Sequence, residues 1–211
     1  MKSDLLIKVI DNKNNSEYFG GDQGWFAGKS AKGYGCGIIA LVNVILTHKK
    51  ANNSANTDCC SITKSQYMHL ADKIRKRYLP IVPGFGINGF ILALGANLYF
   101  LTHGIKAFAR WGVMPCHLWN SVDDMLSRNW PVVLAIGPNN LILGKSTLTM
   151  HASSGQSKIN SHYVTIVAAD TATITVSSWG KRYTIYKRDY ETYMKKTSNP
   201  LFSNILYIAG K

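Results

Sequence analysis

Hydrophobic positions in the first half of the chain recur at the spacing of helices. Apolar side chains follow one another almost without interruption from residue 37 to residue 48, which predicts a helix buried on all sides. Residues 63–78 place apolar side chains three and four positions apart, opposite a basic face, and predict a second helix. Asn88 predicts the cap of a third helix that ends near Thr102, and Ser121, with Asp124 three positions later, predicts the start of a short fourth.

The second half has the pattern of strands. Apolar runs bounded by turn residues predict strands at 132–136, 162–168, 173–176, 182–186 and 205–209. The connection at 170–172 is short, so the strands on either side of it should form an antiparallel hairpin. Helices followed by an antiparallel sheet predict an α+β fold. We expect one domain over residues 1–211, mainly helical to about residue 128 and mainly β from about residue 129.

One stretch tests whether the chain enters a membrane. No charged residue occurs from Pro83 to Ile105, and that length could cross a bilayer. Asn88, Asn97 and His103 interrupt it with polar groups that are unfavourable in lipid. We therefore expect a buried helix of the core and no transmembrane segment.

Positive charge is in large excess. The chain has 24 Lys and Arg against 11 Asp and Glu, a net charge of +13. Such a field favours acidic partners, among them nucleic acid, anionic lipid, an anionic wall polymer or an acidic peptide. Nucleic acid is kept as an alternative because aromatic residues lie among the last basic doublets, at Tyr183, Tyr186, Tyr190 and Tyr193.

Location and cofactors are indicated only by what the sequence lacks. The first residues contain no sustained apolar segment and no secretory signal, so we expect a cytoplasmic protein, or one exported by a route that the sequence does not show. Cys36, Cys59, Cys60 and Cys116 follow no disulfide-framework spacing and are expected to be reduced. Without Cys-x-x-Cys, paired histidines or an acidic cluster, we expect neither a metal nor a cofactor.

Cys36 stands where a thiol is made reactive. It lies between Gly35 and Gly37, directly ahead of the most apolar predicted helix. A helix N-terminus presents unpaired N–H groups and a partial positive charge, which favour a thiolate and can bind an oxyanion. The flanking glycines would let a substrate backbone approach closely. The alternative is a small buried side chain at a helix start.

His162 is the candidate base. It opens the predicted strand at 162–168, after a polar loop, and can turn its ring to the edge of a cleft while the strand packs.

The motifs around these two residues resemble those of papain-like cysteine peptidases, nearest to the bacteriocin-processing (double-glycine leader) type. Gly35-Cys36-Gly37 with Ala40 resembles their nucleophile segment, and Ser161-His162-Tyr163-Val164 resembles their histidine strand. The segment 175–180 is similar to the one that supplies the residue orienting the histidine, and His162 follows Cys36 at close to the roughly 130 residues typical of papain-type enzymes. The resemblance implies a papain-like fold and a thiol hydrolase that acts on a peptide or amide bond.

The resemblance also implies the roles of further residues. Ser177 stands where the family has Asn or Asp and would orient the imidazole, with Ser178 as the alternative if the register differs by one. A serine hydroxyl can accept the imidazole N–H but brings no charge. Gln23 would complete the oxyanion hole, although it could equally be an ordinary turn residue. Trp179 would shield the orienting residue from water.

Three functions follow as hypotheses. The first is a cysteine peptidase with a peptide or protein substrate. The second is a binding module on the same scaffold that has lost catalysis with the orienting acid. The third is a basic nucleic-acid-binding protein. The sequence does not distinguish hydrolysis from transpeptidation, nor does it indicate the oligomeric state.

Overall fold

The computed structural model describes residues 5–52, 61–81, 86–138 and 146–210. The adjacent cysteines Cys59 and Cys60 lie outside these ranges, while Cys36 and Cys116 carry free thiols. No helix in the described ranges is long and apolar enough to span a membrane.

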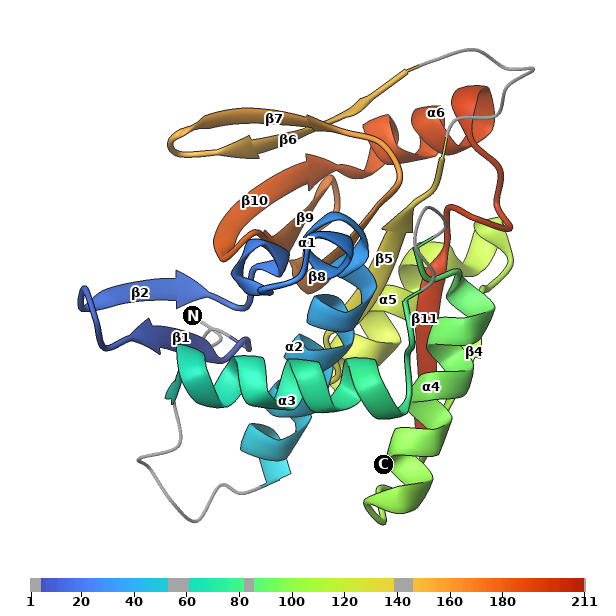
Figure 1. Ribbon diagram of the computed structural model, residues 1–211. Helices are drawn as coiled ribbons and strands as arrows, with labels where there is room; N and C mark the ends of the chain where they lie inside the picture. The colour runs from blue at the N-terminus through green and yellow to red at the C-terminus, as the bar shows by residue number, and fades with distance from the viewer. Residues whose placement is uncertain (1–4, 53–60, 82–85, 139–145, 211) are drawn as a thin grey trace.

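Helices and strands alternate more than the sequence pattern predicts (Figure 1). The helices are α1 Lys29–Tyr34, α2 Cys36–Asn52, α3 Lys64–Arg77, α4 Gly89–Thr102, α5 Leu118–Ser127 and α6 Lys187–Thr197, with 3-10 turns η1 Gln23–Trp25 and η2 Pro115–His117. The strands are β1 Lys8–Asp11, β2 Ser16–Phe19, β3 Ser61–Thr63, β4 Ala107–Trp111, β5 Val132–Ile136, β6 Leu148–Ala152, β7 Gly155–Ile159, β8 His162–Ala169, β9 Thr173–Ser178, β10 Lys181–Tyr186 and β11 Ile205–Gly210.

The strands form two sheets. An eight-stranded antiparallel sheet has the order β4-β11-β5-β8-β9-β10-β6-β7. A three-stranded sheet has the order β2-β1-β3, in which β1 and β3 run parallel. The α+β fold with a helical region and an antiparallel sheet is therefore confirmed.

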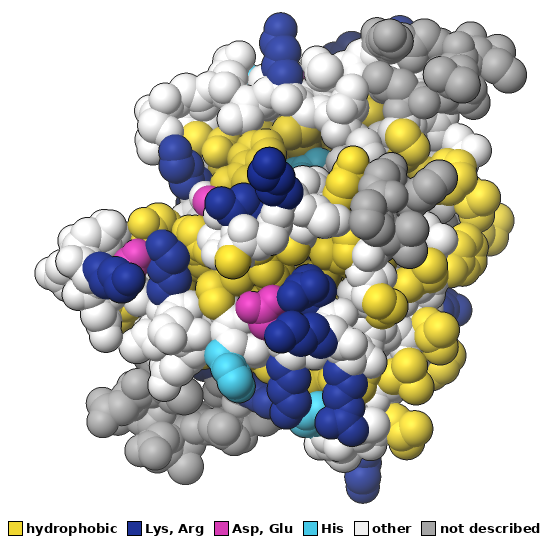
Figure 2. Space-filling model, viewed as in Figure 1, with side chains coloured by type: hydrophobic (Ala, Val, Ile, Leu, Met, Phe, Trp, Pro, Cys, Tyr) yellow, Lys and Arg dark blue, Asp and Glu magenta, His cyan; other side chains and the backbone are white. Residues whose placement is uncertain are grey.

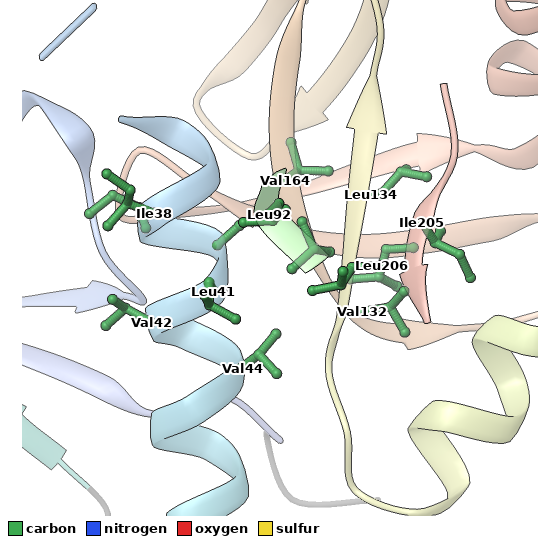
Figure 3. Close-up of a cluster of buried hydrophobic side chains, with 14 of the residues drawn as sticks. Ile38, Leu41, Val42, Val44, Leu92, Val132, Leu134, Val164, Ile205 and Leu206 are labelled. Atoms are coloured by element: carbon green, nitrogen blue, oxygen red, sulfur yellow. The ribbon is translucent and has the colours of Figure 1, made fainter. Parts of the chain in front are cut away.

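Helix α2 is the centre of the core. Its apolar side chains are buried all round, as predicted. Figure 3 shows Leu41 and Val44 pointing toward strands β5, β8 and β11, while Ile38 and Val42 point to the opposite side. Because both sides of α2 are covered, its first residue is held rigidly relative to the sheet.

Local sequence signals explain the starts of α3 and α4. Thr63 accepts a hydrogen bond from the N–H of Gln66, whose side chain accepts one from the N–H of Thr63, and this capping box begins α3. Asn88 accepts from the N–H of Ile91 and begins α4 as predicted. The fourth helix, α5, begins at Leu118 rather than at Ser121, because the turn η2 leads into it.

Helix α4 is not buried on all sides, and this prediction was wrong. One face packs in the core through Leu92, Ala96 and Phe100. The other face is apolar and exposed, with Leu94 60% and Leu101 79% accessible. Hydropathy alone cannot distinguish a buried helix from one with an uncovered apolar side.

Basic side chains outnumber acidic side chains at the surface. Figure 2 shows many Lys and Arg side chains and few Asp and Glu side chains on the face in view. The described residues contain four side-chain ion pairs, Lys8–Glu17, Lys64–Asp11, Arg75–Asp72 and Arg128–Asp124. Most of the cations therefore face solvent without an acidic partner in an ion pair.

Candidate active site

Cys36 is the first residue of α2, and its side chain is only partly exposed. The carbonyl of Gly35 accepts the N–H of Ile39 at 3.1 Å, so the helix begins directly at the cysteine. Burial raises the pKa of the Cys36 thiol, although the backbone N–H groups of Tyr163, Gly37 and Cys36 itself bond the sulfur and lower it. Since Tyr163 follows His162 in β8, the sulfur lies against the strand that carries the candidate base.

The two glycines beside Cys36 have different neighbours. A Cβ on Gly35 would lie 2.4 Å from the carbonyl oxygen of Ala31, so a side chain there would break the contact between α1 and α2. A Cβ on Gly37 would lie 3.3 Å from the ring of Tyr163. Close packing against Ala31 therefore explains Gly35, whereas a side chain at Gly37 would only press on the ring of Tyr163.

His162 is the first residue of β8 and pairs with Ile136 of β5. Its Nε2 lies 2.8 Å from Oγ of Ser178, and its ring stacks on Trp179 with 4.6 Å between the ring centroids. Burial lowers the pKa of His162 to about 4. The imidazole is therefore neutral at pH 7, held at one nitrogen and on one face.

The backbone is unusual on both sides of this contact. Ser161, before His162, has φ 53°, and Trp179, after Ser178, has φ 48°. Residues other than glycine rarely occupy this left-handed region, and such residues concentrate at functional sites. Trp179 and Gly180, with φ 67°, form the tight turn between β9 and β10, which places the indole over the histidine.

The two serines of the orienting segment have different partners. Ser178 contacts His162. The hydroxyl of Ser177 instead donates to the carbonyl oxygen of Phe19 at 2.6 Å, which ties β9 to the end of β2. The geometry thus places Ser178, the alternative in the sequence analysis, where Ser177 was expected.

Gln23 is brought to Cys36 and His162 despite its distance in sequence. Asp22 accepts the N–H of Gly24 and caps the turn η1, which begins at Gln23. Helix α1 occupies about half of the segment between Gln23 and Cys36 and returns the chain to α2. The side-chain amide of Gln23 donates to the carbonyl of Lys32 at 2.7 Å, and its oxygen is buried without a hydrogen-bond partner.

These side chains surround a small internal space of about 10 Å³. Its walls include the five predicted site residues Gln23, Cys36, His162, Ser177 and Ser178, together with Trp179. The space is about large enough for one water molecule. No carboxylate is among the described residues around it, so a positive charge on His162 would have no counter-charge there.

A buried polar network beneath the site was missed by the sequence analysis. Asn43 of α2 accepts the N–H of Gly21 at 3.1 Å and the hydroxyl of Tyr67 at 2.8 Å, and its amide donates to the hydroxyl of Thr165 at 3.1 Å. It thereby joins α2 to α3, to β8 and to the segment before Gln23. A single asparagine inside an otherwise apolar helix was the signal that could have revealed it.

A larger cleft of about 250 Å³ opens beside Cys36 and His162. Tyr34, Ile87, Tyr163 and Phe202 contribute apolar and aromatic surface to its walls. No Lys, Arg, Asp or Glu is among the described residues that line it. In the described ranges, no three His, Cys, Asp or Glu side chains lie close enough together to hold a metal ion.

The comparisons with known proteins bear on the fold. A crystal structure from Bacillus anthracis, provisionally named a C39-like peptidase, superposes with a TM-score of 0.50 at 14% sequence identity, over 97% of this chain and 98% of that one. The fold matches that of a C39-like peptidase. No family model matches the sequence, and no curated protein matches it. At this identity the likeness shows the C39-like fold and leaves the chemistry to be argued from the site.

The aromatic residues that suggested nucleic-acid binding are largely inaccessible. Tyr183, Tyr190 and Tyr193 are buried, and Tyr186 alone of the four is exposed. The hydroxyls of Tyr190 and Tyr193 donate to the carbonyls of Ala135 and Gly137, at the end of β5. Bases could not stack on the three buried rings, so these residues give the nucleic-acid hypothesis little support.

Proposed function

We propose that this protein is a cysteine peptidase in which Cys36 attacks a peptide or amide carbonyl and His162 transfers the proton. The observation that carries the proposal is the position of both residues at one cleft. The thiol lies at the N-terminus of the central helix, and the imidazole lies at the head of the strand that contacts the sulfur. Ser178 holds His162 at Nε2 and leaves Nδ1 available as the base.

The direction of the pKa shifts favours a neutral pair. Burial raises the pKa of Cys36 and lowers that of His162 to about 4, so thiol and imidazole both rest uncharged at pH 7. The sulfur therefore loses its proton as it attacks, and His162 acts as a general base, as in serine peptidases. The thiolate expected at the helix start would need a protonated His162 beside it, and the serine hydroxyl at Nε2 would bring no negative charge to stabilise that imidazolium.

The steps balance without a cofactor. The S–H proton of Cys36 moves to Nδ1 of His162 while sulfur bonds to the carbonyl carbon, and the N–H of Cys36 and the second amide N–H of Gln23 stabilise the oxyanion. The imidazolium then gives its proton to the leaving amine as the C–N bond breaks. Water, deprotonated by His162, attacks the thioester. The C–S bond then breaks to release a carboxylic acid, and the imidazolium returns its proton to the sulfur to restore the thiol.

The cleft indicates the class of substrate. Because no charged side chain is among its described lining residues, we propose that the substrate presents uncharged side chains next to the scissile bond. The aromatic surface of Tyr34, Tyr163 and Phe202 suits apolar groups in an extended peptide.

A peptide library tests the function. The full chain is incubated with a mixed library, and new amino termini are identified by mass spectrometry. We expect cleavage by the wild type and by Cys116→Ala, and at least about a 10³-fold loss in Cys36→Ala and His162→Ala. Cleavage that persists in Cys36→Ala would exclude the proposal.

A second function is favoured by one observation. The group that contacts His162 is an uncharged serine, and the pKa of the imidazole is about 4. Proton transfer to this imidazole from a thiol whose pKa is raised is unfavourable. A binding module that keeps the cleft but not the catalysis would have this chemistry. It predicts that library peptides bind the wild type and Cys36→Ala equally and leave both uncut.

A further inference from the structure

An uncovered apolar ridge runs along α4. Its members lie on one face of the helix and are 42% to 79% exposed. They are Phe90, Ile91, Leu94, Leu98 and Leu101. Their spacing of one, four, eight and eleven positions keeps them within about a third of the helix circumference. In Figure 2 hydrophobic side chains follow the position that α4 has in Figure 1.

The ridge has a fixed orientation because the other side chains and glycines of α4 are anchored beside and behind it. The side chain of Asn97 donates to the carbonyl of Ala109 at 2.8 Å and accepts its N–H at 2.7 Å, so it pairs with the free edge of β4. Gly89 packs against Trp111, and Gly95 packs against Leu79. Rotation of the helix to bury the ridge would break these contacts, so the exposed leucines belong to the folded state.

Three basic side chains, called the rim below, lie beside the C-terminal end of α4. Lys49 lies 5.8 Å from the ring of Tyr99 in α4, and Arg77 lies 5.7 Å from the ring of Tyr78, whose hydroxyl hydrogen-bonds Thr102. Lys106 follows α4 in the chain and is exposed. None of these three cations takes part in an ion pair within the described residues.

Negative charge is absent from the same part of the sequence. No Asp or Glu occurs from Lys73 to Val122, a stretch that contains α4, β4 and the basic end of α3. A second copy of this chain on the ridge would bring two cationic rims together, and each chain carries a net charge of +13. The occupant that complements both the ridge and its rim is apolar in its interior and anionic at its surface.

We propose that this face docks the protein on an anionic lipid surface. The ridge is a convex row of side chains on one straight helix, which suits insertion between headgroups, as interfacial helices do. The cations of the rim would meet anionic headgroups at the same depth. Because Asn88 and Gly89 line the candidate cleft and Phe90 begins the ridge, docking would hold the cleft mouth near the membrane.

Vesicle flotation of the full chain tests the proposal. We expect binding to vesicles of equal parts phosphatidylglycerol and phosphatidylcholine, weakened by salt, and at least about tenfold weaker binding to phosphatidylcholine alone. The triple variant Leu94→Gln, Leu98→Gln, Leu101→Gln should bind at least about tenfold more weakly, and so should Lys49→Gln, Arg77→Gln, Lys106→Gln.

Matched controls lie elsewhere on the surface. Tyr186→Gln removes an exposed aromatic ring from β10, and Lys195→Gln with Lys196→Gln removes two exposed cations from α6. Both controls should bind as the wild type does, and thermal unfolding should show all variants folded.

Several results would overturn the proposal. The proposal is wrong if the wild-type protein does not float with anionic vesicles. It is also wrong if the leucine variant binds as tightly as the wild type. A wild-type dimer in sedimentation velocity that the leucine variant dissolves would assign the ridge to a second copy. Preference for an amphipathic peptide over vesicles would assign it to a peptide partner.

Discussion

The adjacent serines Ser177 and Ser178 provide a matched test of the site. Ser178→Ala removes the hydrogen bond of 2.8 Å to Nε2 of His162, whereas Ser177→Ala removes the bond of 2.6 Å to the carbonyl of Phe19. Both hydroxyls are buried, and the two substitutions are chemically identical. They differ only in whether the lost partner is the candidate base or a backbone carbonyl.

The magnitude follows from the lost contact. A buried polar group left without its partner costs about 1–3 kcal/mol. In Ser178→Ala the lost hydrogen bond is the one that fixes the orientation and the tautomer of the His162 ring. We therefore expect kcat to fall about 10–100-fold. In Ser177→Ala the lost hydrogen bond is the one that joins β9 to β2. The free energy of unfolding should therefore fall by about 1–3 kcal/mol, while kcat stays within about threefold.

Two assays read these effects separately. Cleavage of a peptide selected from the library gives kcat for each variant, and urea unfolding gives stability. The ¹⁵N shifts of the His162 ring report its tautomer and should change in Ser178→Ala alone. If Ser177→Ala lost as much kcat as Ser178→Ala, or if the ring signals of Ser178→Ala were those of the wild type, the assignment of Ser178 would be wrong.

Other predictions concern charge, the oxyanion and the buried network. Ser178→Asp places a carboxylate against Nε2 and should raise the pKa of His162 by about 2–3 units, as measured by an NMR titration of the ring; an unchanged pKa would exclude the contact. Gln23→Ala should lower kcat about 10²–10³-fold with little change in KM, and an equal loss in Asp22→Ala would instead point to the turn η1. Alkylation of Cys36 by iodoacetamide should be slow at neutral pH and rise into the alkaline range, because burial raises the pKa of the thiol; a plateau across neutral pH would indicate a thiolate–imidazolium pair. Asn43→Ala removes the hydrogen bonds to Gly21, Tyr67 and Thr165 and should lower the free energy of unfolding by about 3 kcal/mol or more in urea, whereas a loss below about 1 kcal/mol would show that the network contributes little.

Elements with strong local signals were predicted well. An apolar run predicts helix α2, and the cap at Asn88 predicts the start of α4. Five consecutive apolar residues between a proline and a glycine predict β5. In each case the signal lies within the element or at its end. Local propensity and the final packing agree there, so the sequence was sufficient.

Elements that depend on distant partners were missed. Strands β1, β2 and β3 have only three or four residues each. Strands β1 and β2 form a short hairpin, and β3 pairs with β1 across about fifty residues. Helix α6 buries Tyr190, Tyr193 and Met194 at helical spacing, but its basic doublets drew attention to its exposed face. The hydropathy pattern could not predict that one apolar face of α4 is exposed, because the pattern does not show which other elements pack against a helix.

The choice between Ser177 and Ser178 shows why register is hard to predict. Consecutive residues of a strand point to opposite faces of the sheet, so a shift of one residue exchanges their roles. The pairing of β8 with β9 contains such a shift between Ile166 and Ala168. Only the folded structure shows which of the two serine hydroxyls contacts His162.

The most direct test of the account is the capture of the covalent intermediate. Wild-type protein and an identified library peptide are mixed, quenched with acid within the first turnovers, and digested for mass spectrometry. We predict that the peptide carrying Cys36 gains the mass of the acyl half of the substrate, and that His162→Ala shows no such gain. Substrate turnover with an unmodified Cys36, or an acyl group on Cys116 instead, would contradict the central claim that this sulfur is the nucleophile.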